Sequence, residues 1–517
     1  MNSMRKFLLS RPGKLLVYRE ITNVDMACKA RLMSSSSRRG SAVTTQSQFL
    51  EAKVPQLMSN SNERGNQHSP WIPDSTVQEV CDHYQGLADE GKSNFMSAVA
   101  SGMGVRHDKI LTEASQLQSQ VGREDAAILQ AEKRLRLSLV PGYSTLFSHI
   151  SRLQGGVKFL VDLRADLLDH LLSQQSLQNE AELKALNDTL KDLLIGWFAA
   201  GMLNLERVMW SSSCDMLEKI SQYEAVHPVR NWTDIKHRVG PYRRCFVFTH
   251  SSMPNEPLVI LHTALTRDIS ASIQSIVRKQ NDIAVGVKSG EENPEEAQAA
   301  IFYSITSTQK GLQGVELGNH LIKSVVKELQ SEFPSMHLFS SLSPIPGFRD
   351  WLISQINKQV KDEHNTSLFT SQELDSFKSA LNITSPQALS TLKKVIVTNE
   401  WVKSESLVKS LQSPLMRLCA RYLYVEKRRK MALNPVANFH LRNGATMWRL
   451  NWLGDTSPRG LAASCGMMVN YRYYLENTSS LSQRYIETQN IKASKQILDL
   501  VGNGSSNADM GTVNSKL

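Results

Sequence analysis

Apolar positions divide the chain into a helical first part and a mixed second part. From Pro73 to about Glu206 they recur at helical spacing, interrupted by Pro141-Gly142-Tyr143. One stripe is Leu160, Leu163, Leu167 and Leu171, and another is Leu183, Leu186, Leu190, Leu193 and Trp197. The pattern predicts a helical bundle. Its role is expected to be packing or oligomer contacts, because it lacks the inward-facing Glu and His residues that build a metal site in such bundles.

From about Arg207 the pattern changes to short apolar runs that are typical of strands. Cys245–Phe248 and Leu258–His262 are separated by a short loop with two prolines, which predicts an antiparallel pair. Helical sequence returns later, with a capping box at Thr370 and Glu373 and a run from about Pro386 to Tyr424. The predicted fold class is α+β, an all-helical N-terminal domain followed by a mixed α/β domain.

The segment from Ala299 to Phe348 predicts a strand, a loop, a helix and a second strand. The loop, Gln309 to Gly318, opens a helix whose buried stripe is Leu317, Leu321, Val325 and Leu329. Glycines before a helix N-terminus let backbone N–H groups surround a phosphate, and the helix dipole favours negative charge there. The loop predicts a phosphorylated ligand, although a purely structural turn fits the glycines equally well.

Two further segments carry residues that suit chemistry. Pro344-Ile345-Pro346 removes two backbone donors, so the second strand must end or splay next to Ser343. A hydroxyl that satisfies backbone at a strand end is the simpler interpretation of Ser343, and Ser340 and Ser341 compete with it by composition. His440 is either a core residue or an acid/base group. A hydrolase triad is disfavoured because no G-x-S-x-G motif occurs.

Composition and charge narrow the function classes. With 517 residues, 41% of them apolar, the chain is long enough for two domains. Residues 1–40 hold nine Lys or Arg and two acidic residues, so most of the net charge of +10 lies there, and a nucleic-acid partner is not indicated. The six cysteines lack C-x-x-C spacing, which argues against a zinc site and a disulfide framework. No apolar run approaches the roughly 20 residues of a membrane span.

Both ends resemble targeting segments. Residues 1–70 are predicted to be disordered and basic, and the Arg- and Ser-rich first 40 fit a mitochondrial import signal or a plain basic tail equally well. Ser515-Lys516-Leu517 is the peroxisomal tripeptide, and residues 503–517 are polar enough for a flexible tail. We therefore expect the peroxisome, the mitochondrion or both, with the cytoplasm as a further location and import machinery as a partner.

The loop and several later segments point to known families. Gln313–Gly318 resembles the coenzyme A loop of GNAT-type acetyltransferases, Q/R-x-x-G-x-G/A, with Glu316 in place of its first glycine. That loop, together with the following segments, is similar to the malonyl-CoA decarboxylase family. These segments are Phe339–Phe348, Pro414–Cys419, Asn434–His440, Ser464–Gly466, Asn470–Tyr473 and the terminal Ser-Lys-Leu. The resemblance runs from about residue 73 to the end.

The resemblance implies conversion of malonyl-CoA to acetyl-CoA and CO₂ without metal, biotin or another cofactor, since coenzyme A is part of the substrate. It implies a helical domain (71–206), a GNAT-like catalytic domain (207–502) in which the thioester lies between two diverging strands, and a homotetramer. The family's catalytic serine, its presumed proton acceptor, falls on Ser343, and its catalytic histidine falls on His440, which would protonate C2.

Supporting roles also follow from the resemblance. Glu316 would lie beside the acyl group and orient His440 or Ser343, and Tyr473 would complete the pocket. The residues expected to contact the ligand are Gln313, Gly314, Val315, Glu316, Leu317, Gly318 and Asn319, with Ser343 and His440. Two alternatives stay open: a GNAT-like acyl-CoA transferase, and a non-catalytic regulator that binds malonyl-CoA and uses its helical domain for interaction.

Overall fold

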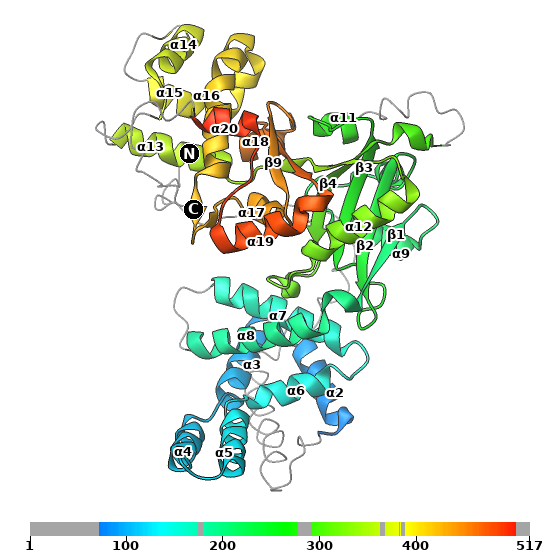
Figure 1. Cartoon of the computed structure of the whole chain (residues 1–517), viewed down its shortest axis with the longest axis vertical. Helices are drawn as coiled ribbons and strands as arrows, with labels where there is room; N and C mark the ends of the chain where they lie inside the picture. The colour runs from blue at the N-terminus through cyan, green and yellow to red at the C-terminus, as the bar shows by residue number, and fades with distance from the viewer. Residues whose placement is uncertain are drawn as a thin grey trace, which may run out of the picture.

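The computed structural model describes residues 72–173, 179–277, 292–361, 368–381, 383 and 388–502. A helical domain lies at one end, and a larger domain with a mixed sheet lies at the other (Figure 1). This arrangement confirms the predicted α+β class. The predicted targeting segment (1–70) and the tail with its tripeptide (503–517) lie outside the described residues.

Leucine stripes hold the helical domain together as predicted. Its helices are α2 (Asp74–Gln85), α3 (Asp89–Gly102), α4 (His107–Ser119), α5 (Asp125–Ser138), α6 (Gly142–Ile150), α7 (Gly156–Ser173) and α8 (Glu180–Trp197). Leu160, Leu163 and Leu167 of α7 meet Leu183, Leu186 and Leu190 of α8 in one core. Leu193 is only partly buried, and Leu194 is the buried neighbour that joins the core of the second domain.

Eight strands of the described residues form one mixed sheet in the second domain. They are β1 (Leu203–Val208), β2 (Arg243–His250), β3 (Val259–Thr266), β4 (Ala299–Ser307), β5 (Leu338–Ser341), β6 (Ser343–Pro344), β9 (Thr446–Asn451) and β10 (Met468–Tyr473). The order is β1-β2-β3-β4-β5-β10-β6, and β9 pairs with β10. The predicted antiparallel pair is β2 and β3. The predicted domain boundary at residue 206 falls inside β1, so the sheet domain begins earlier, at Leu203.

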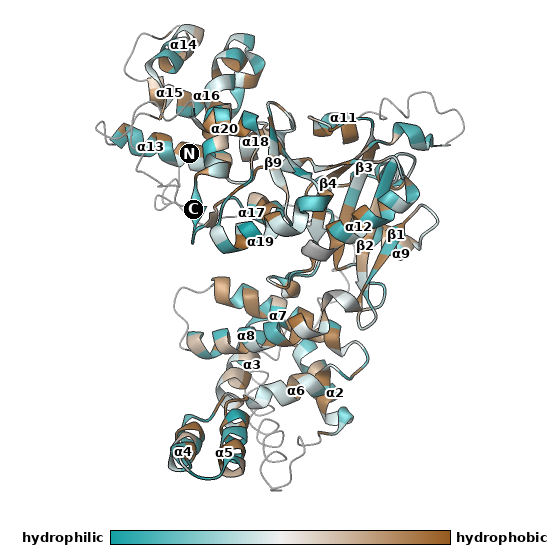
Figure 2. Ribbon diagram, viewed as in Figure 1, coloured by the Kyte–Doolittle hydropathy of each residue, from teal (hydrophilic) through white to brown (hydrophobic). Residues whose placement is uncertain are grey.

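The sheet has two buried faces, which explains the nearly continuous apolar strands (Figure 2). Helix α12 (Gly318–Glu332) packs on the face that contains Phe246 and Phe248, through the predicted stripe Leu317, Leu321, Val325 and Leu329. Helices α9 (Cys214–Tyr223) and α10 (Trp232–Arg238) cover the alternate residues, Cys245 and Val247, on the opposite face. Helix α12 also connects β4 to β5, which are parallel.

The remaining helices complete the second domain. They are α11 (Ile273–Val277), α13 (Phe348–Lys361), α14 (Ser371–Leu381), α15 (Ala388–Thr398), α16 (Glu405–Tyr424), α17 (Pro435–Arg442), α18 (Pro458–Ser464), α19 (Thr478–Thr488) and α20 (Lys495–Gly502), with a small ribbon of β7 (Lys427–Arg428) and β8 (Met431–Ala432). The predicted capping box precedes α14, since the Thr370 N–H and the Glu373 carboxylate are 2.9 Å apart and the reciprocal contact is 3.2 Å. No helix in the described part of the chain is long and apolar enough to cross a membrane.

Candidate active site

The splay predicted at Ser343 opens a pocket between β4 and β6. Strands β4 and β5 pair in parallel only from Ala299↔Leu338 to Phe302↔Ser341. The chain then leaves β4, and Ser343 pairs with Val469 of β10 instead. A pocket of about 240 Å³ occupies the gap. It is lined by Val226, Phe302, Tyr303, Ser304, Ile305, Ser307, Ser343, Pro344, Pro435, Val436, Phe439 and His440.

Three of the predicted site residues meet at this pocket in one line of hydrogen bonds. His440 Nε2 lies 2.9 Å from Ser343 Oγ, and His440 Nδ1 lies 2.7 Å from the Tyr473 hydroxyl oxygen. All three side chains are buried, with at most 4% of each residue exposed. These residues come from β6, α17 and β10, and Ser343 and His440 are nearly 100 positions apart in the sequence. Together they form one hydrogen-bonded unit.

Ser341 and Tyr471 extend this unit. The Ser343 hydroxyl donates to Ser341 Oγ over 2.8 Å, and the Tyr471 N–H donates to the same oxygen over 3.3 Å. The Tyr471 ring stacks on the His440 ring with centroids 4.6 Å apart. Because Ser343 uses its proton on Ser341, its oxygen can accept from His440 Nε2–H, and Nδ1 can then accept from the Tyr473 hydroxyl.

Burial sets the protonation of the unit. Desolvation lowers the pKa of His440 to about 3, since the partners of both ring nitrogens are neutral hydroxyls. Desolvation also raises the pKa of Tyr473 well above its ordinary value. At neutral pH the site therefore holds a neutral imidazole between two hydroxyl groups.

Asn434 ties the histidine helix to the serine segment. As the N-cap of α17, its side-chain oxygen accepts from the Ala437 N–H over 2.8 Å, and its amide donates to the Pro346 carbonyl over 2.9 Å. The Tyr422 hydroxyl donates to the same carbonyl. One buried side chain thus fixes the start of α17 against the chain that has just left Ser343.

The predicted ligand loop lies next to α17. It runs through a 3₁₀ turn, η4 (Lys310–Leu312), and reaches α12 at Gly318. A Cβ on Gly318 would lie 2.5 Å from the Phe439 ring, so a glycine is needed for this close approach. Glu316 forms an ion pair with Arg442, two residues after His440, and its side chain is 54% exposed. Its predicted role in orienting His440 or Ser343 stays a prediction.

The other predicted loop residues differ in what they offer a ligand. Gly314 has a φ of +83°, which suits glycine, and the Leu317 side chain is buried in the core, so only its backbone is available. The Asn319 side chain lies outside the described residues. Gln313 and Val315 precede the helix and stay predictions, as does the whole set of ligand contacts.

Two members of the site, Ser341 and Tyr471, have no assigned role in the sequence-based prediction. Alternation along a strand could have found Tyr471, because residues two apart share a face and Tyr473 was already a candidate. By composition Ser341 only competes with Ser343, and the structure makes it a hydrogen-bond partner instead. Within the described ranges, no group of His, Cys, Asp and Glu side chains has the arrangement of a metal site.

Comparison with known proteins gives a single answer. Residues 103–198 match the model of the malonyl-CoA decarboxylase N-terminal domain, and residues 201–510 match the model of the C-terminal domain. The crystal structure of malonyl-CoA decarboxylase from Rhodopseudomonas palustris has a TM-score of 0.71 and 28% sequence identity, and the match covers 87% of this chain and 99% of that one.

Two relatives extend the match at higher identity. The mitochondrial malonyl-CoA decarboxylase of the goose Anser anser anser is 49% identical over 479 residues, 92% of each chain. That of Rattus norvegicus is 52% identical over 431 residues, which are 83% of this chain and 85% of the rat protein. The chain therefore belongs to the malonyl-CoA decarboxylase family.

Proposed function

We propose that this protein is a carboxy-lyase that converts malonyl-CoA to acetyl-CoA and CO₂ in fatty-acid and malonate metabolism. The observation that carries the proposal is the hydrogen-bonded line of Ser343, His440 and Tyr473 at the pocket between diverging strands. It supplies hydroxyl and imidazole N–H groups from buried side chains, which is what the reaction needs.

The reaction needs no external electron sink. When the C2–C3 bond of the malonyl group breaks, its electron pair moves to C2, and the adjacent thioester carbonyl accepts it as an enolate while CO₂ leaves. The enolate then takes one proton at C2 and becomes the acetyl thioester. The protein must stabilise the enolate oxygen and supply that proton, so we propose that no cofactor is used.

His440 is the proton donor in this proposal. The neutral ring, with Nδ1 accepting from Tyr473, presents Nε2–H toward the Ser343 hydroxyl. A neutral imidazole donates more readily to a strongly basic enolate carbon than to a weakly basic thioester carbonyl, so the proton moves after CO₂ is lost. The ring then regains one proton from solvent through its hydrogen-bonded hydroxyl groups, which balances the proton that the reaction consumes. Ser343 holds the substrate carboxylate or relays the proton.

Glu316 raises a question of charge, because a carboxylate beside the malonyl carboxylate would repel it. Glu316 forms an ion pair with Arg442, whose positive charge offsets the negative charge of the carboxylate. We propose that Arg442 balances Glu316, so that the acidic residue can lie near the acyl group. The loop from Gln313 to Asn319 and the N-terminus of α12 would hold the phosphates of coenzyme A.

Location and assembly belong to the same proposal. The names of the relatives support a mitochondrial location, and we keep the peroxisome as a second destination, tested by imaging residues 503–517 fused to a fluorescent protein. We also propose a homotetramer. The α4–α5 hairpin supports self-association, since it exposes Leu111, Leu129 and Leu137, each more than 60% accessible.

The decisive experiment gives the purified protein malonyl-CoA alone. We expect CO₂ and acetyl-CoA without any acyl acceptor, and we expect Ser343→Ala and His440→Asn to lose roughly 10²–10⁴-fold in kcat while still binding coenzyme A. Binding is measured by calorimetry. Near-normal turnover by Ser343→Ala would remove the serine from the mechanism.

The same assay separates the alternatives. Strict dependence on an amine or another acceptor would identify an acyl-CoA transferase, for which the loop and pocket would serve equally. Binding of malonyl-CoA without turnover, from mildly acidic to alkaline pH, would identify a regulator.

A further inference from the structure

The helical domain touches the predicted coenzyme loop directly. Helix α7 packs on η4, and a Cβ built on Gly311 would lie 1.8 Å from the Val161 carbonyl oxygen of α7. No side chain larger than hydrogen fits there without moving one of the two backbones. Gly311 therefore serves the contact between the domains.

Arg164 of α7 crosses this contact. It is 2% exposed, and its guanidinium donates to the carbonyl oxygens of Gly311 and Gln313, the latter over 3.0 Å. Its Nε donates to the Asn187 side chain of α8 over 3.1 Å. All of these acceptors are neutral oxygens. The buried guanidinium of Arg164 therefore lies directly against the loop without a carboxylate among these hydrogen-bond partners.

These bonds decide which way the loop peptides face. In a trans peptide the N–H points away from the C=O of the same unit. Because the Gln313 carbonyl points at Arg164, the Gly314 N–H points away from it, at a residue whose φ of +83° suits glycine. The Lys191 side chain of α8 also lies against Gly314, with its Nζ 3.6 Å from the position of a Cβ.

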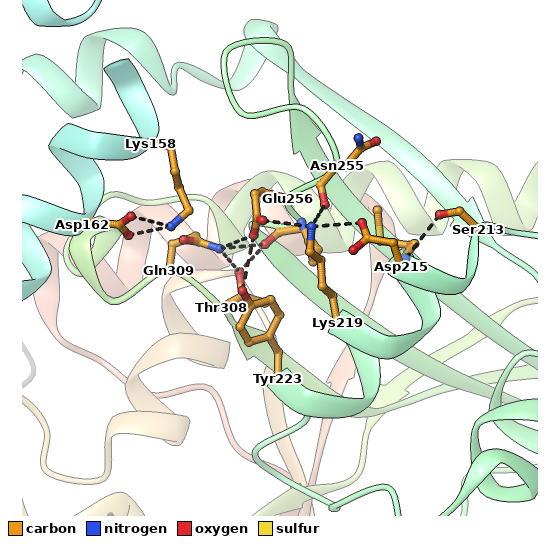
Figure 3. Close-up of polar contacts among 12 residues, drawn as sticks. Lys158, Asp162, Ser213, Asp215, Lys219, Tyr223, Asn255, Glu256, Thr308 and Gln309 are labelled. Atoms are coloured by element: carbon orange, nitrogen blue, oxygen red, sulfur yellow. Dashed lines mark hydrogen bonds and ion pairs between the residues drawn. The ribbon is translucent and has the colours of Figure 1, made fainter. Parts of the chain in front are cut away.

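The base of the loop is held by the catalytic domain (Figure 3). There the Gln309 amide lies 3.4 Å from a Glu256 carboxylate oxygen, and Glu256 in turn pairs with Lys219. The Thr308 hydroxyl donates to the Leu258 carbonyl over 3.1 Å. Figure 3 shows the Lys158–Asp162 pair of α7 on the other side of Gln309. The base is thus fixed by the catalytic domain, and the Gly311–Gly314 segment is fixed by the helical domain.

We propose that the helical domain is part of the coenzyme A site and that Arg164 is its positioning residue. Arg164 fixes the Gln313–Gly314 peptide so that its N–H faces the phosphates, and it places positive charge behind them. This inference rests on the proposed use of the loop for coenzyme A. It gives the helical domain a role in substrate binding besides packing and self-association.

The test compares two substrates in the full-length protein. We expect Arg164→Met to raise KM for malonyl-CoA by roughly 10- to 100-fold, the range of a lost charged hydrogen bond, with little change in kcat. For malonyl-pantetheine, which lacks the nucleotide and its phosphates, we expect kcat/KM to stay unchanged. Arg164→Lys should recover part of the loss, since one ammonium can reach one of the two carbonyls.

Controls make each outcome decisive. Lys184→Met on α8 removes an exposed cation that pairs with Glu180 and should leave both substrates unaffected. Equal losses on both substrates for Arg164→Met and Arg164→Lys would show a general structural role and overturn the proposal, as would an unchanged KM. Calorimetry measures the binding of coenzyme A alone, which needs no turnover. Weaker binding by Arg164→Met would therefore support this inference even if the proposed reaction were wrong.

Discussion

At the scale of single residues, the surroundings of His440 set its protonation state. A histidine at the surface would be partly charged at neutral pH. His440 is buried between two hydroxyl groups and under the Tyr471 ring, with no carboxylate among its described ring contacts to stabilise an imidazolium. The neutral ring is therefore the form that meets the substrate.

This environment predicts an unusual pH profile. The pKa of His440 is lowered to about 3, so the ring is already neutral above roughly pH 5, and kcat/KM, which reports the free enzyme, should be flat from there to about pH 7.5. Initial rates with malonyl-CoA over this range, after brief exposure to each pH, measure it. An acidic limb with a midpoint near 6.5, the ordinary histidine value, would contradict the buried neutral ring.

The sequence could predict part of this arrangement. Ser343 and His440 followed from the family resemblance, whereas composition left Ser340 and Ser341 as competitors. Strand alternation puts Ser341 and Ser343 on one face, and the Ser340 hydroxyl bonds instead to the carbonyls of Ser341 and Tyr471. The serine that contacts His440, 97 positions away, is determined by tertiary packing. The spacing of residues along the sequence does not predict it.

At the scale of elements, the short helix α17 determines whether Ser343 and His440 meet. Its N-cap, Asn434, holds both its own first turn and the Pro346 carbonyl. A helix of this length has little stability of its own, so its position depends on such contacts.

We expect Asn434→Ala to lower the free energy of unfolding by about 2 kcal/mol, because it removes a cap and a buried hydrogen bond. Activity should fall further than stability alone explains, since α17 is no longer tied to the serine segment. Denaturant unfolding and kcat measure the two effects. Asn434→Ser keeps a cap acceptor without the amide donor and adds no charge, so it isolates the Pro346 contact.

Ser404→Ala is the matched control, since Ser404 caps α16 at a partly exposed site. It should cost about 1 kcal/mol of stability and leave kcat intact. If Asn434→Ala behaved in the same way, α17 would need no anchor on Pro346.

The strand, loop, helix and second strand of the Ala299–Phe348 segment were predictable from periodicity and are confirmed as β4, η4, α12 and β5. The reason for the loop glycines was only partly predictable. Gly311 meets α7 and Gly318 meets Phe439, so both serve close packing with segments that are distant in sequence. A local pattern can show that a glycine is present, but it does not show which neighbour requires it.

At the scale of the whole molecule, a second buried cluster joins the segment after β1 to the sheet. The Glu224 carboxylate accepts from the Ser304 hydroxyl and from the N–H groups of Val226 and His227. His262 Nε2 lies 3.3 Å away from it. Ser304 lines the pocket, and His262 lies on the neighbouring strand β3. The buried polar cluster around Glu224 therefore contacts both the pocket wall and the sheet.

This cluster predicts that the protein loses stability in mild acid. Burial lowers the pKa of His262 to about 4, and the attraction of Glu224 offsets only part of that effect. The unfolded chain, with an ordinary pKa near 6.5, therefore binds more protons between pH 6.5 and 4, so the free energy of unfolding falls as pH falls through this window. The loss from His262 alone is on the order of 3 kcal/mol.

Denaturant midpoints between pH 7.5 and 4.5 measure this loss. His262→Gln removes one of the titrating groups, so it should flatten the pH dependence even if it lowers stability at pH 7.5. The variant His337→Gln, at an exposed histidine, should keep the wild-type slope. A slope that is the same with and without His262 would mean that other groups bind the protons.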